Sequence, residues 1–154
     1  MESLSQGIRA GTRSSKPPPS PSGVPTAKDV MATDLVILRP DQTVKEAIAL
    51  FLKHRISGAS VVGPGNTLVG VLSELDCMRV LASAAFDGEP PNGQRRVGEL
   101  MSTTVTTIEP STDLYAIVHM FFDRRVRRLP VLVGNQLVGQ VSRRDVLQAM
   151  STML

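Results

Sequence analysis

The sequence contains one pattern twice, and this internal repeat limits the possible folds more than any other feature. Residues 30–62 align without a gap on residues 100–132 at an offset of 70. A turn that reads GPGN in the first copy and GN in the second changes the offset to 69, and GVLSELD then aligns with GQVSRRD. Ser73 and Asp76 therefore correspond to Ser142 and Asp145. The chain is expected to fold as two similar units.

The residue pattern of each copy predicts a strand, a helix, two further strands and a closing helix. In the first copy, Thr43 and Glu46 form a capping box, and apolar residues then recur at helical spacing. Asp113 is the expected N-cap of the equivalent helix. The apolar positions of the two helices are Val44, Ala47, Ile48, Phe51 and Leu52, and Leu114, Ile117, Val118, Phe121 and Phe122. Strands are expected at 35–38, 59–62, 67–73, 129–133 and 136–142, and closing helices at 74–85 and 143–154.

The predicted fold class is α+β, with two tandem β-α-β-β-α motifs packed about a pseudo-two-fold axis. A unit of about 60 residues has little core of its own, so the two motifs are expected to pack together. Clefts at such a junction are where small ligands usually bind.

The expected domains follow from composition. Residues 1–26 are rich in Ser, Pro and Gly and are expected to form a disordered tail. The tail also has the composition of an organelle transit peptide, which stays open as an alternative. The first motif is expected at 27–85, a linker at 86–96 and the second motif at 97–154. Deletion of the tail is expected to leave thermal stability unchanged.

Charge and composition exclude several classes of function. The net charge of +3 comes from residues 1–28, while residues 29–154 hold 13 basic and 13 acidic side chains. A broad nucleic-acid footprint is therefore not expected. The sequence has no metal-ligand spacing, catalytic triad or P-loop, so the chain is not expected to be an enzyme. No apolar run approaches the roughly 18 residues needed to span a bilayer. The single cysteine, Cys77, indicates a core residue and a reducing, cytoplasmic location.

The two Ser-x-x-Asp stretches allow more than one interpretation. A capping box alone accounts for GVLSELD. In GQVSRRD, two arginines occupy the first helical turn, where positive charge opposes the helix dipole. Six arginines fall within 21 residues of the second copy: Arg124, Arg125, Arg127, Arg128, Arg143 and Arg144. They indicate an anion bound between them, or alternatively a solvated basic face with Asp123 and Asp145 as ion-pair partners.

Together, these motifs resemble a pair of CBS motifs, the Bateman module. The resemblance rests on Val-Met or Leu-Met near the start of each copy, ISGASVV or VRRLPVLV in the middle, and LVG-x-h-S-x-x-D near the end. It covers about residues 28–152. The resemblance implies a regulatory module that binds an adenosine-containing ligand between the motifs and forms a homodimer. AMP, ADP or ATP is the expected ligand, with S-adenosylmethionine or an NAD-like molecule as alternatives, and no catalytic cofactor is implied.

The resemblance also implies the role of individual positions. Asp76 and Asp145 would accept hydrogen bonds from ribose hydroxyls, which suits a carboxylate. Arg127 and Arg128 would contact phosphate, whereas Ser57-Gly58 at the same place in the first copy offers no charge. Adenine would lie near Val36 or Thr106 on the opposing motif. The implied nucleotide-binding residues are Val36, Ser57, Gly58, Ala59, Leu72, Ser73, Asp76, Thr106, Arg127, Arg128, Leu129, Val141, Ser142 and Asp145, with Arg143 and Arg144 as further phosphate candidates.

Three functions remain open from the sequence. The first is an adenine-nucleotide sensor acting on an unknown effector protein, with two unequal clefts. The second is a ligand-free interaction module that serves assembly alone. The third is nucleic-acid binding through the arginine cluster and the basic tail.

Overall fold

The computed structural model describes residues 8–10 and 23–154, and most of the expected tail lies outside these residues. The chain divides into two compact units. Among the described residues, unit 1 holds Val36–Thr104, and unit 2 holds 8–10, 23–35 and Val105–Leu154.

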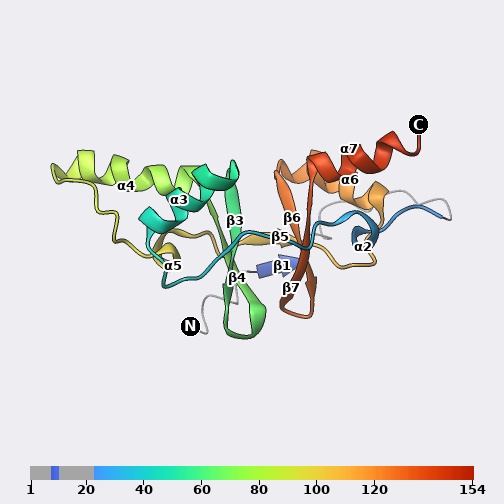
Figure 1. Ribbon diagram of the computed structural model, residues 1–154, viewed down its shortest axis with the longest axis horizontal. Helices are drawn as coiled ribbons and strands as arrows, with labels where there is room; N and C mark the ends of the chain where they lie inside the picture. Colours follow the sequence, from blue (N-terminus) through green and yellow to red (C-terminus); the bar gives the residue numbers. More distant parts are fainter. Residues whose placement is uncertain (1–7, 11–22) are drawn as a thin grey trace. The chain divides into compact units, whose positions relative to one another are not determined.

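Unit 1 is built around a three-stranded sheet. Strand β2 (Ile37–Leu38) pairs in parallel with β3 (Gly58–Gly63), and β3 pairs antiparallel with β4 (Thr67–Ser73). A short 3₁₀ turn, η1 (Pro64–Asn66), joins β3 and β4. The helices are α3 (Val44–His54), α4 (Glu74–Asp87) and the short α5 (Val97–Leu100). Figure 1 shows α3 and α4 against the β3–β4 hairpin.

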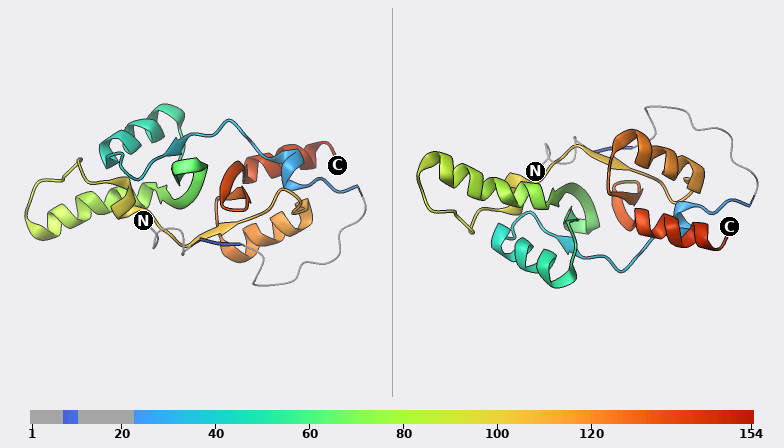
Figure 2. Two further views of the ribbon diagram at one scale, coloured as in Figure 1. Left: turned by 90° about the horizontal axis from the view of Figure 1, so that it is seen from below. Right: turned by 90° about the horizontal axis from the view of Figure 1, so that it is seen from above.

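Unit 2 repeats this plan. Strands β6 (Arg128–Val133) and β7 (Gln136–Ser142) form an antiparallel hairpin. Residues after β5 (Val105–Thr107) continue in parallel alongside β6 through the bridge between Ile108 and Val131. The helices are α2 (Ala27–Val30), α6 (Leu114–Arg124) and α7 (Arg143–Ser151). Both views of Figure 2 show α6 and α7 side by side.

Local sequence signals account for the ends of the equivalent helices α3 and α6. Helix α3 begins after the predicted capping box, in which the Glu46 amide donates to the Thr43 hydroxyl at 3.2 Å. Helix α6 begins after Asp113, whose carboxylate accepts from the Ala116 amide at 2.9 Å. Each helix ends in a left-handed residue, at Arg55 and Arg125. These starts agree with the sequence prediction.

Each unit has its own apolar core of aliphatic side chains. In unit 1, Val61 and Leu72 from the hairpin pack with Val44 and Phe51 from α3. Cys77 belongs to this core, as expected, and burial raises the pKa of its thiol. In unit 2, Leu129 and Val141 of the hairpin, Ile117 of α6 and Val146 of α7 form the equivalent cluster.

The buried faces are narrower than the predicted apolar stripes. Val44, Ala47 and Phe51 of α3 are buried, whereas Leu52 is 75% exposed and Ile48 is 39% exposed. In α6, Phe122 is 79% exposed. Periodicity identified the helices, but it did not show that part of each stripe lies outside the unit's core.

The segment that opens each sequence repeat packs into the unit formed mainly by the other repeat. In unit 1, Ser102 and Val71 exchange two backbone hydrogen bonds of 2.9 Å. In unit 2, Ala32 and Gln140 do the same at 2.9 and 3.0 Å. The compact units therefore do not coincide with the contiguous motifs expected at 27–85 and 97–154, because their opening segments are exchanged.

These exchanged segments explain the glycine of each Gly-x-aliphatic-Ser-x-x-Asp stretch. A Cβ on Gly70 would lie 2.7 Å from the Met101 sulfur and 2.8 Å from the Ser102 carbonyl oxygen. A Cβ on Gly139 would meet Met31 in the same way. Glycine is thus required at both positions by the close approach of another segment.

The folded region begins before residue 27. The Leu114 amide donates to the Pro25 carbonyl at 2.9 Å, and Val24 packs against the core of unit 2. Thr26 caps α2 together with Asp29. Residues 24–26, which were expected in the tail, contribute to unit 2. Strand β1 (Ile8–Ala10) pairs in parallel with β5.

Candidate functional site

The two Ser-x-x-Asp stretches form nearly identical capping boxes. In unit 1, the backbone amide and hydroxyl of Ser73 donate to Oδ2 of Asp76 at 2.8 and 3.0 Å. The Asp76 amide donates back to the Ser73 hydroxyl at 3.3 Å. In unit 2, the corresponding distances between Ser142 and Asp145 are 2.8, 2.9 and 3.2 Å. The capping interpretation is therefore correct for both copies.

Capping uses only one oxygen of each aspartate. In Asp76, the other oxygen, Oδ1, lies 3.6 Å from Nη1 of Arg79, whose side chain is 70% exposed. In Asp145, no described residue donates a hydrogen bond to Oδ1. The Asp76 residue is 7% exposed, and Asp145 is half-buried. Each capped aspartate thus keeps acceptor capacity that a hydroxyl group could use.

Strand register places the start of β3 beside the cap of unit 1 and the start of β6 beside the cap of unit 2. In unit 1, Gly58 pairs with Ser73 and Ala59 pairs with Leu72. The Glu74 amide also donates to the Ser57 carbonyl at 3.0 Å. The predicted residues 57–59, 72, 73 and 76 therefore lie together within unit 1.

Unit 2 brings its own set together in the same register. Arg128 pairs with Ser142, and Leu129 pairs with Val141. Nη2 of Arg143 donates to the Val126 carbonyl at 3.3 Å, so this side chain reaches toward the segment that precedes Arg128.

The six arginines do not form one uniform patch. Arg128 is half-buried at the start of β6, and Arg127 beside it is exposed. Arg144 is also exposed, in the first turn of α7. The equivalent positions in unit 1 are Gly58, Ser57 and Leu75. Unit 2 therefore carries positive charge at three positions that are uncharged in unit 1, where the basic residue beside the cap is Arg79.

Val36 and Thr106 each lie in the unit that holds the capped aspartate of the same repeat. Val36 directly precedes β2, which pairs with β3, so it belongs to the same unit as Asp76. Thr106 lies in β5 and belongs to the same unit as Asp145. The expectation that a base held at one cap lies near Val36 or Thr106 of the opposing motif stays a prediction.

A comparison with known families settles the relationship. The model of the CBS domain matches residues 27–83 and 97–152. The chain belongs to the CBS domain family. It carries two CBS motifs, and its fold is the mixed α+β fold of CBS pairs.

Individual relatives span most of this CBS pair. The CBS domain-containing protein YhcV of Bacillus subtilis (strain 168) is 31% identical over 121 residues, which cover 79% of this chain and 82% of YhcV. The crystal structure of CBSX2 in complex with AMP has a TM-score of 0.73 and 25% identity, covering 84% of this chain and 98% of that one. The cytosolic domain of the Mg²⁺ channel MgtE in complex with ATP has a TM-score of 0.67 and 26% identity. The match covers 80% of this chain and 48% of that one.

Hydropathy adds one finding about the helices. Among the residues that the structure describes, no helix has both the length and the apolar character needed to cross a membrane.

Proposed function

We propose that this CBS pair is a regulatory module that binds an adenine nucleotide, AMP, ADP or ATP, and carries out no catalysis itself. The observation that carries the proposal is the geometry of the two capped aspartates. Each lies beside the strand start that the family resemblance associates with nucleotide binding, and each has one oxygen outside the cap. Solved relatives bound to AMP and to ATP support this choice of ligand.

In the proposed site, the carboxylate oxygen outside the cap accepts hydrogen bonds from the ribose. Such charge-assisted bonds are worth about 1.5–3 kcal/mol when they are shielded from water. Val36 beside residues 57–59, and Thr106 beside Arg128 and Leu129, would provide the surface for the base. The nearby helix N-termini of α4 and α7 add amide dipoles that favour an anion.

The two sites are proposed to differ in their preference for phosphate. Arg127 and Arg128 lie at the start of the strand beside the cap of unit 2, whereas Ser57 and Gly58 occupy this position in unit 1. Guanidinium groups bind phosphate oxygens through paired hydrogen bonds. Unit 2 is therefore the stronger site for ADP and ATP, and this preference weakens as salt screens the charges.

The test must separate ribose binding from helix capping. Asp145→Asn keeps an amide oxygen that can accept the cap hydrogen bonds but removes the charge and the second acceptor oxygen. We expect it to lower the affinity for ADP about 10-fold or more, with little change in melting temperature. Thr43→Ala is the matched variant, because it removes a cap hydroxyl from α3 and leaves the implied nucleotide-binding residues intact. It should lower the melting temperature while binding ADP as well as the wild type does.

Calorimetric titration with adenosine, AMP, ADP and ATP, alongside thermal unfolding with each ligand, provides the measurements. If no adenine nucleotide binds the folded wild-type chain, the alternative of a ligand-free interaction module replaces this proposal. If nucleotides bind but Asp145→Asn retains wild-type affinity, the aspartate is only a helix cap and the ligand lies elsewhere.

A second pair of variants tests the inequality of the sites. Arg128→Gln should weaken ADP binding several-fold and leave adenosine binding unchanged, because only ADP carries phosphate. Lys53→Gln is the control, since it removes one exposed positive charge from α3 in unit 1. If both variants weaken ADP binding equally, only the overall charge of the protein determines the affinity for ADP.

A further inference from the structure

Strand β1 pairs with a part of unit 2 that the family resemblance assigns to the base of a nucleotide. Residues 8–10 of β1 lie in parallel register with residues 105–107 of β5, and Arg9 pairs with Thr106. Both strands belong to unit 2, and Figure 1 shows them beside each other. Thr106 is one of the implied nucleotide-binding residues, so β1 and the base would use the same short strand.

Backbone geometry indicates which edge of β5 faces β1. The Ile108 amide donates to the Pro130 carbonyl at 2.9 Å, and the Ile108 carbonyl accepts from the Leu132 amide at 2.9 Å. The backbone groups of Ile108 therefore point toward β6. Successive residues of a parallel strand direct their amide and carbonyl groups to opposite edges. Val105 and Thr107 therefore direct theirs away from β6, to the edge where β1 lies.

This edge of β5 has the hydrogen-bonding groups that suit adenine. The Val105 carbonyl is an acceptor and the Thr107 amide is a donor, and both belong to the same edge. Adenine carries a donor amino group next to the acceptor N1, and proteins bind bases through this edge of the ring. The central residue of β1 likewise presents one amide and one carbonyl to β5. Strand β1 and adenine are therefore alternative partners for one edge of β5.

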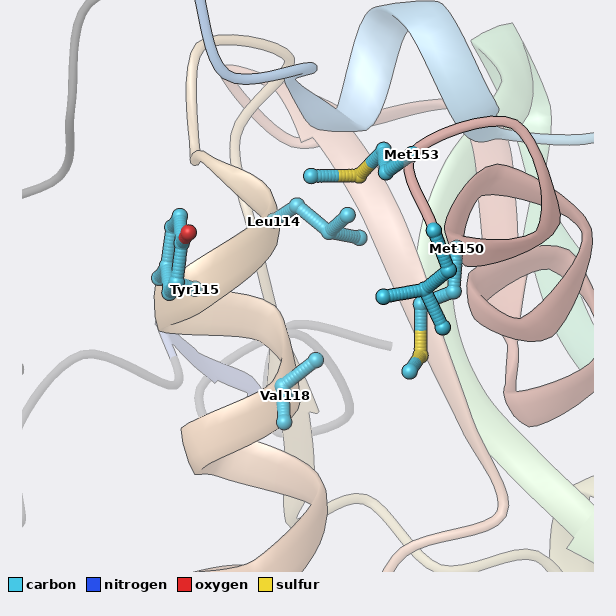
Figure 3. A pocket seen from close by; sticks show the side chains of 6 residues that line it. Leu114, Tyr115, Val118, Met150 and Met153 are labelled. Atoms are coloured by element: carbon cyan, nitrogen blue, oxygen red, sulfur yellow. The ribbon is translucent and has the colours of Figure 1, made fainter.

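The apolar pocket of unit 2 does not offer a nucleotide an alternative position. It has a volume of about 280 Å³ and opens between α6 and the end of α7. Figure 3 shows Leu114, Tyr115 and Val118 on one side and Met150 and Met153 on the other. None of the lining residues belongs to the implied nucleotide-binding set, and none has a charged side chain for phosphate. The edge of β5 therefore stays the position for the base in unit 2.

Unit 1 has no equivalent of β1 in the part of the chain that the structure describes. By the repeat alignment, residues 35–37 correspond to residues 105–107. Strand β2, which includes Ile37, pairs with β3 and is the outermost strand on that side of its sheet. Strand β1 therefore covers only one of the two proposed base positions, and it makes them unequal independently of the arginines.

We propose that β1 is an autoinhibitory strand that covers the base-binding edge of β5, so that β1 and an adenine nucleotide exclude each other there. This inference rests on the proposed function. Peptides bind many proteins as an added strand on a sheet edge, and β1 does so within its own chain. The few hydrogen bonds of a three-residue strand are offset by the cost of ordering the segment, so a ligand can displace it. By linkage, nucleotide binding releases β1.

Two substitutions at Arg9, made in the full chain, test the competition. Arg9→Pro removes the amide at the centre of β1, whereas Arg9→Gln removes the charge and keeps the amide. In calorimetric titration, we expect one of the two sites of Arg9→Pro to bind adenosine and ADP about 3-fold or more tightly than in Arg9→Gln, because more molecules have an open β5 edge. The factor should be the same for both ligands, since β1 competes with the base and not with the phosphate.

Hydrogen exchange followed by NMR tests the strand independently of affinity. Without ligand, the Thr107 amide should exchange faster in Arg9→Pro than in Arg9→Gln, because it loses its partner strand. In the wild-type chain, saturating ADP should speed the exchange of the Arg9 amide and leave the Thr107 amide protected, because the base replaces β1. Ligand-free melting curves of both variants should match the wild type, since β1 contributes only three residues.

The possible results separate this inference from the proposed function. If Arg9→Pro and Arg9→Gln bind both ligands equally, β1 does not compete with the base, and only the inference is wrong. Weaker binding by Arg9→Pro would also contradict it, because β1 would then complete the site. If neither ligand binds any of the three folded chains, the proposed function itself fails, and the competition fails with it.

Discussion

Units 1 and 2 have the same backbone plan but differ in the side chains beside their capped aspartates. In both, a hairpin strand leads into a Ser-x-x-Asp cap with almost the same distances. The strand paired with it begins at Gly58 in unit 1 and at Arg128 in unit 2. The comparison shows that both repeats keep the same backbone and the same cap. The charge beside the cap differs between the copies without changing the fold.

The largest expected effect tests whether the opening segment of each repeat packs equally tightly against Gly70 and Gly139. Gly70→Ala and Gly139→Ala each place a Cβ against the methionine that closes the unit. Overpacking of this kind costs about 1–3 kcal/mol, so urea unfolding should show both variants destabilised by similar amounts. Gly93→Ala is the control, because its Cβ would only reach normal contact with Lys45 at 3.4 Å. Destabilisation by one of the two alone would show that the units are closed differently.

A smaller effect tests the equivalence of the two caps. Ser73→Ala and Ser142→Ala should each cost about 1 kcal/mol of unfolding free energy, because each removes the same hydroxyl from a helix N-terminus. The near-identical cap distances predict equal losses. Denaturant unfolding of both variants measures this. A clear difference would mean that side chains around the caps, and not the caps themselves, determine local stability.

Acid should weaken the Thr43–Glu46 cap of helix α3. Hydrogen bonds from Thr43 lower the pKa of Glu46 below its ordinary value of 4.5, whereas the equivalent residue in unit 2 is Ala116. A carboxyl group with a lowered folded-state pKa stabilises above its ordinary pKa, and this stabilisation disappears as pH falls through the folded-state value. The melting temperatures of the wild type and Glu46→Gln should therefore converge between about pH 6 and pH 3. A difference in melting temperature that stays constant over this pH range would show that ionisation of Glu46 does not stabilise the fold.

The smallest effect concerns the centre of strand β3. Ser60 is 1% exposed, and its hydroxyl has no hydrogen-bond partner among the described residues, whereas unit 2 has Pro130 at this position. A buried polar group without a partner is costly. Ser60→Ala should therefore leave stability unchanged or raise it by up to about 1 kcal/mol. Thermal unfolding that shows a marked loss would mean that the hydroxyl is hydrogen-bonded in solution.

Sequence was sufficient for the features that depend on neighbouring residues. The repeat, the helix that follows Thr43, the hairpins and the capping form of Ser-x-x-Asp all follow from short-range patterns. The strand expected at 35–38 is reduced to Ile37–Leu38, which is a difference at the end of an element only. The arginine cluster was also visible, because it depends on composition within a short segment.

Contacts between distant segments could be learned only from the tertiary structure. Pairing of β2 with β3 placed Val36 in the unit of Asp76, and the exchanged opening segments gave Gly70 and Gly139 their steric role. The exposure of Leu52 and Phe122 likewise depends on how far each core extends around its helix. The sequence by itself therefore determined the main helices and hairpin strands of each repeat, their caps and the family, since these arise within a few residues along the chain. The short elements β1, α2 and α5 were not predicted. The tertiary structure decided which segment closes each unit and which apolar faces stay uncovered, because packing brings together residues that no local pattern connects.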